Sequence, residues 1–372
     1  SSASAKETME FNSEGVCRAC TFNALKHDGS IDWESREREL LDLCDQYRKT
    51  DGSYDCIVGG SGGKDSAMQS YLLKYKYNMN PILCTWSPNL STPQGERNFQ
   101  AWLNLGFANY TVYQNQKAHR ILTKLAFEGL CHPFQPFIIG QKNFAPKIAQ
   151  KKNIQLVMFG EHDAEFGSDL ERWDKPSMNI NRFTHDKIDY NDLFLGGVQL
   201  KEILKKYNFT IEDIDDYLPI ETEVFNSNKI EFHYYSYYKK WNFHDNYYYA
   251  INNSKFTPQK ERIQGSYDKY SSMDDKIDYL HFYTYYIKFG MGRATAASEQ
   301  EIRAGVINRD EGISLVKRFD SEFPSKYYND FLDYMQINEK EFNEVIDRSR
   351  PDHLWEKIGN EWRLKKPIWE SD

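Results

Sequence analysis

The sequence predicts an α/β protein with a doubly wound, mostly parallel sheet that has helices on both faces. Short apolar runs alternate with helical patterns between residues 54 and 159, and a glycine-rich turn joins the first run to the first helix. Such alternation indicates βαβ units, whose strands lie parallel. Beyond about residue 186 the alternation is lost. We therefore expect a mainly helical, aromatic-rich region after the sheet.

The predicted elements follow in chain order. An amphipathic helix is expected at 34–49. Predicted strands span 54–58, 81–86, 110–113 and 154–159, and the helices between them span 66–77, 98–105, 118–127 and 142–151. Later helices are expected at 198–207, 211–217 and 274–289, with three more between 298 and 348, two of them separated by the region of Pro324. Ligands of such sheets bind beyond the carboxyl ends of the strands.

Composition excludes several classes of protein. The chain has 372 residues and a net charge of −8, a balance that disfavours a nucleic-acid partner. No apolar run approaches the roughly 20 residues of a membrane span, and nothing resembles a signal peptide. Six cysteines, several of them inside apolar runs, do not form a disulfide framework. We expect a cytoplasmic protein without a membrane partner.

The strongest motif is a glycine-rich run between the first predicted strand and the helix after it. It reads Gly59-Gly60-Ser61-Gly62-Gly63-Lys64-Asp65-Ser66. Glycines let the backbone approach phosphates, and the helix N-terminus adds the positive end of its dipole. The two serines offer hydroxyls and the lysine a positive charge. The run is not a Walker A loop, because an aspartate follows the lysine and the glycine spacing is shorter. It predicts a phosphate site.

Two further loops follow predicted strands. Thr85-Trp86-Ser87 ends the second strand and is expected to meet adenine, and the loop 160–165 ends the fourth and is expected to bring carboxylates, Glu161 among them, to the phosphate loop. A solvated loop is the alternative for both. The densest tyrosine stretch, 232–249, is interpreted as packing, or as a wall facing a sugar or nucleotide.

The pair Cys17-Arg-Ala-Cys20 is a two-thiolate half-site of the kind found in zinc ribbons. A structural zinc needs four ligands, and the sequence has no second CxxC. The pair is therefore half of a ribbon that begins before the first residue, a redox pair, or without function.

The string Ser-Gly-Gly-Lys-Asp-Ser, residues 61–66, resembles the PP-loop of the ATP pyrophosphatase superfamily, which includes asparagine, GMP and NAD synthetases and tRNA thiolation enzymes. The resemblance implies cleavage of ATP between its α- and β-phosphates. A substrate oxygen becomes an adenylate, pyrophosphate leaves, and a nucleophile displaces AMP. A carboxylate beside the pyrophosphate suits Mg²⁺, so Asp65 is a candidate ligand or positioning group.

From about Gly15 to Leu364 the chain resembles the N-acetyl sugar amidotransferases of surface-glycan biosynthesis. Relatives help to make acetamidino sugars for lipopolysaccharide, or acetamidino forms of pseudaminic or legionaminic acid for flagellin. The resemblance rests on the CxxC, on Trp86-Ser-Pro-Asn-Leu90, on Asp274-Asp-Lys-Ile-Asp278, on Lys288-Phe-Gly-Met-Gly-Arg-Ala-Thr295 and on His353-Leu-Trp355. Members usually carry another CxxC about fifteen residues earlier. Its absence from this sequence puts the zinc site in doubt.

The resemblance implies that ATP converts the oxygen of an acetamido group into an imidoyl adenylate, which ammonia displaces to give an acetamidino group. We assign pyrophosphate binding to Gly60, Ser61, Gly62, Gly63, Lys64 and Ser66, and a catalytic role also to Lys64. Asp65 is assigned to Mg²⁺ binding or catalysis, Arg293 to catalysis through an anionic group of the sugar or pyrophosphate, and Glu161 to further catalysis. From their place after the second strand, Trp86 and Ser87 are assigned to adenine. ATP and Mg²⁺ are the implied cofactors, and Zn²⁺ at Cys17 and Cys20 is a further candidate.

No glutaminase signature is found, and Cys131 beside His132 resembles a nucleophile pair only superficially. The resemblance implies ammonia from a separate glutaminase through a cyclase-like channelling subunit. We expect three parts: 1–50 with the CxxC and a helix, 51–185 binding ATP, and 186–372 binding the sugar or a partner. The alternatives are a tRNA-modifying PP-loop enzyme and a non-catalytic nucleotide-binding subunit of a glycan assembly complex.

Overall fold

The centre of the molecule is a five-stranded parallel sheet with the order β3-β2-β1-β4-β9. The computed structural model describes residues 10–168, 170–180, 184–186 and 192–370. The strands are β1 (Cys56–Gly59), β2 (Pro81–Trp86), β3 (Asn109–Val112), β4 (Leu156–Phe159) and β9 (Glu231–Tyr234). The expected α/β class and its parallel sheet are confirmed.

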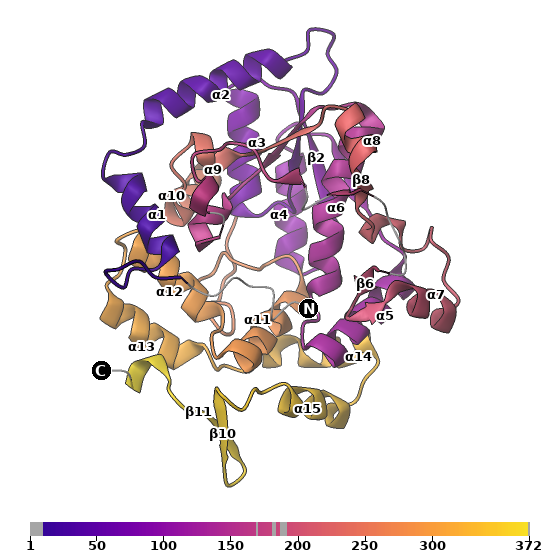
Figure 1. The fold of residues 1–372 in the computed structure, drawn as a ribbon, viewed down its shortest axis with the longest axis vertical. Helices are drawn as coiled ribbons and strands as arrows, with labels where there is room; N and C mark the ends of the chain where they lie inside the picture. The colour runs from indigo at the N-terminus through magenta and orange to yellow at the C-terminus, as the bar shows by residue number, and fades with distance from the viewer. Residues whose placement is uncertain (1–9, 169, 181–183, 187–191, 371–372) are drawn as a thin grey trace.

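Helices cover both faces of this sheet (Figure 1). Ile57 and Val157 point to one face and pack with α5 (Gln116–Leu130) and α6 (Gln135–Lys152). Val58 and Met158 point to the other and pack with α2 (Trp33–Tyr47), α3 (Lys64–Tyr75) and α4 (Pro93–Leu103). Successive side chains of a strand alternate between faces. Each strand therefore contributes to two separate cores.

The strand order reverses next to β1. β2 and β3 lie on one side of β1, and β4 and β9 lie on the other. The loops that leave the carboxyl ends of β1 and β4 therefore open at a switch point of the sheet. Open parallel sheets bind their ligands at this place.

The second half of the chain forms many shorter elements around the sheet. They are α7 (Leu200–Tyr207), α8 (Thr222–Ser227), α9 (Tyr235–Tyr238), α10 (Phe243–Asn253), α11 (Lys276–Phe289), α12 (Arg293–Arg303), α13 (Arg309–Phe319), α14 (Tyr328–Met335) and α15 (Glu339–Arg348). A hairpin of β10 (Trp355–Ile358) and β11 (Glu361–Leu364) extends from the body near the C-terminus (Figure 1).

The remaining elements are short, apart from α1 (Arg18–His27) at the N-terminus. They are η1 (Asp163–Phe166), η2 (Leu170–Arg172), β5 (Thr184–His185), β6 (Phe194–Leu195), β7 (Val198–Gln199), η4 (Asp215–Tyr217), β8 (Ile220–Glu221), η5 (Ser325–Tyr327) and η6 (Ile368–Glu370). Within the described residues, none of the helices has both the length and the apolar character that a bilayer crossing requires.

Three expectations about elements are corrected. The helix expected at 211–217 is only the 3₁₀ turn η4, in a stretch rich in aspartates, whose side chains compete with the helical backbone for hydrogen bonds. Four helices, α12 to α15, replace the three expected between 298 and 348. The sheet also continues beyond residue 186, because β9, inside the tyrosine-rich stretch, pairs with β4.

The start of α11 is fixed to the carboxyl edge of the sheet by Asp275. This side chain is fully buried, caps α11 through the amide of Ile277 at 2.9 Å, and accepts hydrogen bonds from the amides of Asn89 and Leu90, just beyond β2. The adjoining backbones are also bonded, from the amide of Lys276 to the carbonyl of Leu90 at 2.9 Å. The C-terminal region therefore begins at the edge where the glycine-rich loop lies.

Candidate functional site

The glycine-rich loop has one packed side and one open side. Gly62 has φ +85°, and a Cβ on it would lie 2.8 Å from the Cα of Phe99. A Cβ on Gly60 would lie 2.3 Å from the Cβ of Ser66. In contrast, a Cβ on Gly59 or Gly63 would meet nothing within 4 Å. The open side thus includes Gly63, the N-cap of α3, where backbone amides favour an anion.

The lysine and aspartate of the loop are held by α10. Lys64 is only 6% exposed, forms an ion pair with Asp65, and lies 4.7 Å from the ring centroid of Phe243. The side-chain amide of Asn246 donates a hydrogen bond of 2.9 Å to Asp65. The carboxylate of Asp65 therefore has two partners that fix its position.

Glu161 lies beside Asp65, as the sequence led us to expect. Burial, together with the negative charge of Asp65, raises the pKa of Glu161 to about 7, although Lys64 opposes the shift. Two adjacent carboxylates at a phosphate-binding loop fit Mg²⁺, which proteins bind through one or two carboxylates together with phosphates and water. Asp65 and Glu161 are the residues that would hold it.

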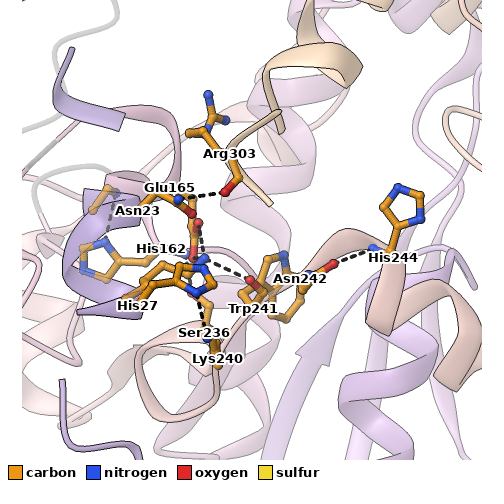
Figure 2. A network of polar contacts seen from close by, with 12 residues as sticks. Asn23, His27, His162, Glu165, Ser236, Lys240, Trp241, Asn242, His244 and Arg303 are labelled. Atoms are coloured by element: carbon orange, nitrogen blue, oxygen red, sulfur yellow. Dashed lines mark hydrogen bonds and ion pairs between the residues drawn. The ribbon is translucent and has the colours of Figure 1, made fainter. Parts of the chain in front are cut away.

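The other carboxylates of the loop 160–165 face away from the glycine-rich loop. Asp163 accepts a hydrogen bond from Tyr234. Both oxygens of Glu165 lie 2.8 Å from the ammonium of Lys26 in α1, which also donates to the carbonyl of Trp241 at 2.9 Å. Figure 2 shows Glu165 and Trp241 in this network. Glu165 therefore attaches α1 to the body, and Glu161 alone of this loop meets Asp65.

The same network joins α1 to α12. Asn23 donates a hydrogen bond of 2.7 Å to the carbonyl of Arg303, the last residue of α12 (Figure 2). His162 is buried, and its amide donates to the hydroxyl of Ser236 at 2.6 Å. These contacts hold the backbone that leaves β4 and carries Glu161.

The C-terminal region supplies a second set of charged side chains to the loop. Ser61 lies beside the carboxylate of Asp274, whose pKa is raised by burial although Ser61 opposes the shift. Asp278 lies one helical turn further on. Its pKa is lowered, because the hydrogen bond from His281 and the charge of Arg293 outweigh its burial. The loop therefore meets residues more than 200 positions away in sequence.

Arg293 is placed beside this set with its charge available. Its guanidinium stacks on the ring of Phe282 at 4.2 Å from the centroid and interacts with the charge of Asp278. Within the described residues it forms no ion pair. In contrast, Arg262 forms a two-pronged pair with Glu322 at 2.6 and 2.7 Å. An unpaired, partly buried guanidinium suits an anionic ligand.

The backbone around Arg293 is already occupied. The amides of Gly292 and Thr295 donate to the carboxylate of Asp320 at 2.7 and 2.9 Å, and the hydroxyl of Thr295 donates to it at 2.6 Å. Asp320 thus caps α12 in the way that an anion would. Of the string 290–295, only the side chain of Arg293 is left for a ligand.

The residues expected to meet adenine lie in the core. Trp86 is 3% exposed, and its ring packs edge-on against Tyr217, with centroids 5.2 Å apart. The hydroxyl of Ser87 is buried and donates to Gln114 at 2.8 Å. The side chain of Trp86 has no open face for a base, because it fills the space between β2 and α6.

The cysteine pair does not fit the expected zinc. Cys17 is the N-cap residue of α1 and lies beside Cys20, whose pKa is raised first by burial and then by Cys17. In the described part of the chain, no cluster of three or more histidine, cysteine, aspartate or glutamate side chains is placed to hold a metal. A structural zinc needs four ligands. A zinc role for Cys17 and Cys20 is therefore not supported.

Cys131 and His132 do not face each other as a nucleophile and its base. Cys131 is buried, and burial raises the pKa of its thiol to about 11. The ring of His132 stacks instead on that of His281, with centroids 4.8 Å apart.

Asp274, Asp278 and His281 were missed as site residues, although Asp274 and Asp278 belong to a string that the sequence comparison singled out. Their spacing at the start of a predicted helix was the available signal. Side chains at i, i+4 and i+7 share one face of a helix. What the sequence did not reveal was that Asp274, just before this helix, lies beside Ser61 of the glycine-rich loop.

The fold and site define an α/β protein whose glycine-rich loop, at the switch point of a parallel sheet, is completed by a C-terminal helical region. Residues 264–368 match the family model described as LPS biosynthesis protein WbpG-like, C-terminal domain. This segment contains Asp274, Asp278, His281 and Arg293.

Two other similarities are more limited. An uncharacterized protein of Methanocaldococcus jannaschii is 31% identical over 77 residues, which are 21% of this chain and 27% of that protein. The chain thus matches about a quarter of that relative's length. The structure of NMN synthetase from Francisella tularensis aligns with 50% of this chain and 74% of its own, at 16% identity and a TM-score of 0.27. A similarity at this level defines neither fold nor function.

Proposed function

We propose that this protein is an ATP-dependent, AMP-forming amidotransferase that converts an acetamido group of a nucleotide-linked or acidic sugar into an acetamidino group. The product would enter a surface glycan such as lipopolysaccharide. One observation carries the proposal. The position of Ser61 beside Asp274 joins a PP-loop-like sequence to the region that matches a lipopolysaccharide-biosynthesis domain.

The loop residues would hold the pyrophosphate part of ATP. Gly63 has free space on its open side, so phosphate oxygens can approach the first amides of α3 without a steric barrier. Lys64 is buried and forms an ion pair with Asp65. When ATP binds, its ammonium would donate hydrogen bonds to a phosphate as well as to Asp65. Mg²⁺ held by Asp65 and Glu161 would neutralise charge on the departing group. The protein's part is therefore positioning and charge stabilisation.

Arg293 would bind the anionic part of the sugar substrate. Its guanidinium is unpaired within the described residues and rests on Phe282. A planar guanidinium binds a carboxylate or a phosphate through two parallel hydrogen bonds. An acidic sugar and a nucleotide-linked sugar both provide such a group. Arg293 lies beside Asp278, one turn from the residue that touches the loop, so the sugar would reach toward the bound ATP.

The test is release of AMP and pyrophosphate from ATP with ammonium chloride, across a panel of nucleotide-linked and acidic diacetamido sugars. We expect AMP that depends on one sugar, and a product about one mass unit lighter, because oxygen is replaced by NH. Lys64→Ala should abolish the reaction, whereas Lys340→Ala, whose side chain is 86% exposed, should not change it. ADP as the product, or AMP stimulated by tRNA and indifferent to every sugar, would overturn the proposal.

Ammonia would come from a separate glutaminase through a channelling subunit. The buried thiol of Cys131, with its raised pKa, has no activating base in the described residues and is unsuited to act as a glutaminase nucleophile. We expect activity with ammonium salts and little with glutamine. Full activity of the pure chain on glutamine would contradict this part of the proposal.

A further inference from the structure

We propose that His281, held by Asp278, accepts the proton that the attacking ammonia must lose during amidine formation. This inference rests on the proposed function and goes further, because it assigns the proton acceptor of the second half-reaction. Neither residue was expected at the site from the sequence. The proposal stands on their position, on their orientation and on the chemistry of the step.

The position of His281 follows from the path of α11. The segment before α11 is fixed to the sheet edge by Asp275, and Asp274 touches Ser61 of the loop. α11 begins at Lys276, and at 1.5 Å per residue His281 lies roughly 7.5 Å along the helix axis from this first residue.

The orientation of the imidazole is fixed on several sides. Nδ1 lies 3.0 Å from the carboxylate of Asp278. The ring is stacked on His132 at 4.8 Å and on Phe134 at 5.3 Å, each with an interplanar angle of 16°, and it is tilted against Phe282 at 4.9 Å. A ring held in this way cannot turn freely, so its two nitrogens keep distinct environments.

The carboxylate of Asp278 selects the useful tautomer. The pKa of Asp278 is lowered by His281 and by Arg293 despite its burial, so the group is an anion that accepts from Nδ1–H. The proton of a neutral ring then resides on Nδ1, and Nε2 keeps its lone pair. Among the described residues, Nε2 has no hydrogen-bond partner. A carboxylate that orients a histidine in this way leaves Nε2 available as a general base.

The chemistry requires such a group. Ammonia adds to the imidoyl carbon, and the new C–N bond leaves a positive charge on the added nitrogen, which still carries three protons. Unless one of them is removed, ammonia is a better leaving group than AMP and the addition reverses. Nε2 of His281 takes this proton. The C–O bond to AMP then breaks, the electron pair leaves with the phosphate oxygen, and an amidinium group remains.

The charged and titratable groups that face His281 come from three elements. They are Asp278 on its own helix, His132 on the turn between α5 and α6, and Arg293 on α12, which interacts with Asp278. His132 stacks on the same ring as a neighbour and is not part of the proposed proton path. The exposed His353 has no part in the site, so His353→Gln is a matched control for a change of imidazole to amide.

The experiment separates the two half-reactions. Sugar-dependent exchange of labelled pyrophosphate into ATP, measured without ammonia, reports the first, and acetamidino product formed with ammonium chloride reports the second. We expect His281→Gln to keep the exchange and to lower product formation by about 10²-fold or more. Its kcat/KM, calculated on the concentration of free ammonia, should also lose the acidic limb of the pH profile. Asp278→Asn should act in the same direction, and His353→Gln should change neither reaction more than about twofold.

The outcomes are distinguishable. If the parent protein shows no sugar-dependent exchange and no AMP, the proposed function fails. If the parent is active and His281→Gln lowers both half-reactions equally, or neither, the role of His281 is overturned and the function stands. Circular dichroism checks each variant for folding. If His281→Gln does not fold, Asp278→Asn decides, because a pH profile and a product yield like those of the parent would overturn the proposal.

Discussion

Two neighbouring glycines of the loop have different roles, one in the fold of the loop and one in ligand binding, and the sequence alone does not distinguish them. Gly62 is needed for its left-handed backbone and its contact with α4, whereas Gly63 has ordinary backbone angles, φ −66° and ψ 164°, and free space around it. Gly62 therefore belongs to the folding of the loop. Gly63 instead provides space for a ligand of the loop.

This difference predicts opposite results for two alanine substitutions. Gly62→Ala should lower the free energy of unfolding by at least about 1–2 kcal/mol, because a Cβ is disfavoured at positive φ and would collide with Phe99. Gly63→Ala should leave stability within about 0.5 kcal/mol but weaken ATP binding at least about tenfold. Urea denaturation and calorimetric titration with ATP measure the two quantities. Undiminished ATP binding by Gly63→Ala would mean that phosphates do not approach this side.

Glu161 makes stability depend on pH. Its pKa is raised from 4.5 to about 7, first by burial and then by Asp65, so the folded state holds the proton more tightly than the unfolded state. The resulting stabilisation is fully present below pH 4.5 and is lost as the pH rises through about 7.

Glu161→Gln removes this dependence. The variant should gain stability relative to the parent as the pH rises from 4.5 to 7, and the gain should level off above that range. Urea denaturation across this range measures it, with the exposed Glu344→Gln as a control that should follow the parent. Parallel curves for the parent and Glu161→Gln would show that this carboxyl is not perturbed.

At the scale of elements, α12 depends on a carboxylate from the end of α13. Asp320 accepts three hydrogen bonds from the first turn of α12, and this turn begins with Arg293. The cap therefore fixes both the helix and the direction of the guanidinium. A ligand that bound the helix end itself would have to displace Asp320.

Asp320→Ala should cost about 2 kcal/mol of unfolding free energy, the upper range for loss of a cap. The surface change Glu344→Ala, which removes only a distant pairing with Lys340 at 3.9 Å, should cost a few tenths. Thermal and urea unfolding compare them. An equal effect of the two changes would mean that the contacts of Asp320 add nothing to the helix.

A comparison of the expected and observed helices and strands shows which boundaries local sequence determines. β2 begins and ends at the expected residues, and the other expected strands were located to within two residues at either end, because apolar runs between turn signals are a local property. α6 begins seven residues before the expected position, since Pro136 is acceptable in the first turn of a helix. β9 was missed because Glu-Phe-His-Tyr has no long apolar run, and its strand form depends on pairing with β4.

The features of the candidate site likewise fall into those that local sequence predicts and those that depend on tertiary packing. The loop 59–66 was recognisable because its function lies in consecutive residues. The contact of Ser61 with Asp274 and the burial of Trp86 depend on how distant segments pack, and no single window of sequence encodes them. Within the described residues Arg293 forms no ion pair, and this too depends on packing, because the nearby Asp320 already accepts hydrogen bonds from Gly292 and Thr295.

At the scale of the whole molecule, the N-terminal helix is attached by a buried ion pair. Lys26→Met should destabilise the protein by about 3–5 kcal/mol, because it leaves the carboxylate of Glu165 buried and uncompensated. The double variant Lys26→Met/Glu165→Gln should recover much of the loss. Urea denaturation measures stability, and limited proteolysis around residues 28–32 reports release of α1. A double variant as unstable as the sum of the single changes would exclude this coupling.

The late position of β9 in the chain affects how the protein is synthesised. When β4 has left the ribosome, its outer edge has no partner, and it stays open until residue 234, some 75 positions later, has also emerged. An open strand edge can pair with other chains. The nascent protein thus passes through a stage with an exposed edge, and its yield in a cell would depend on how quickly translation covers that interval and on chaperones that bind the chain meanwhile.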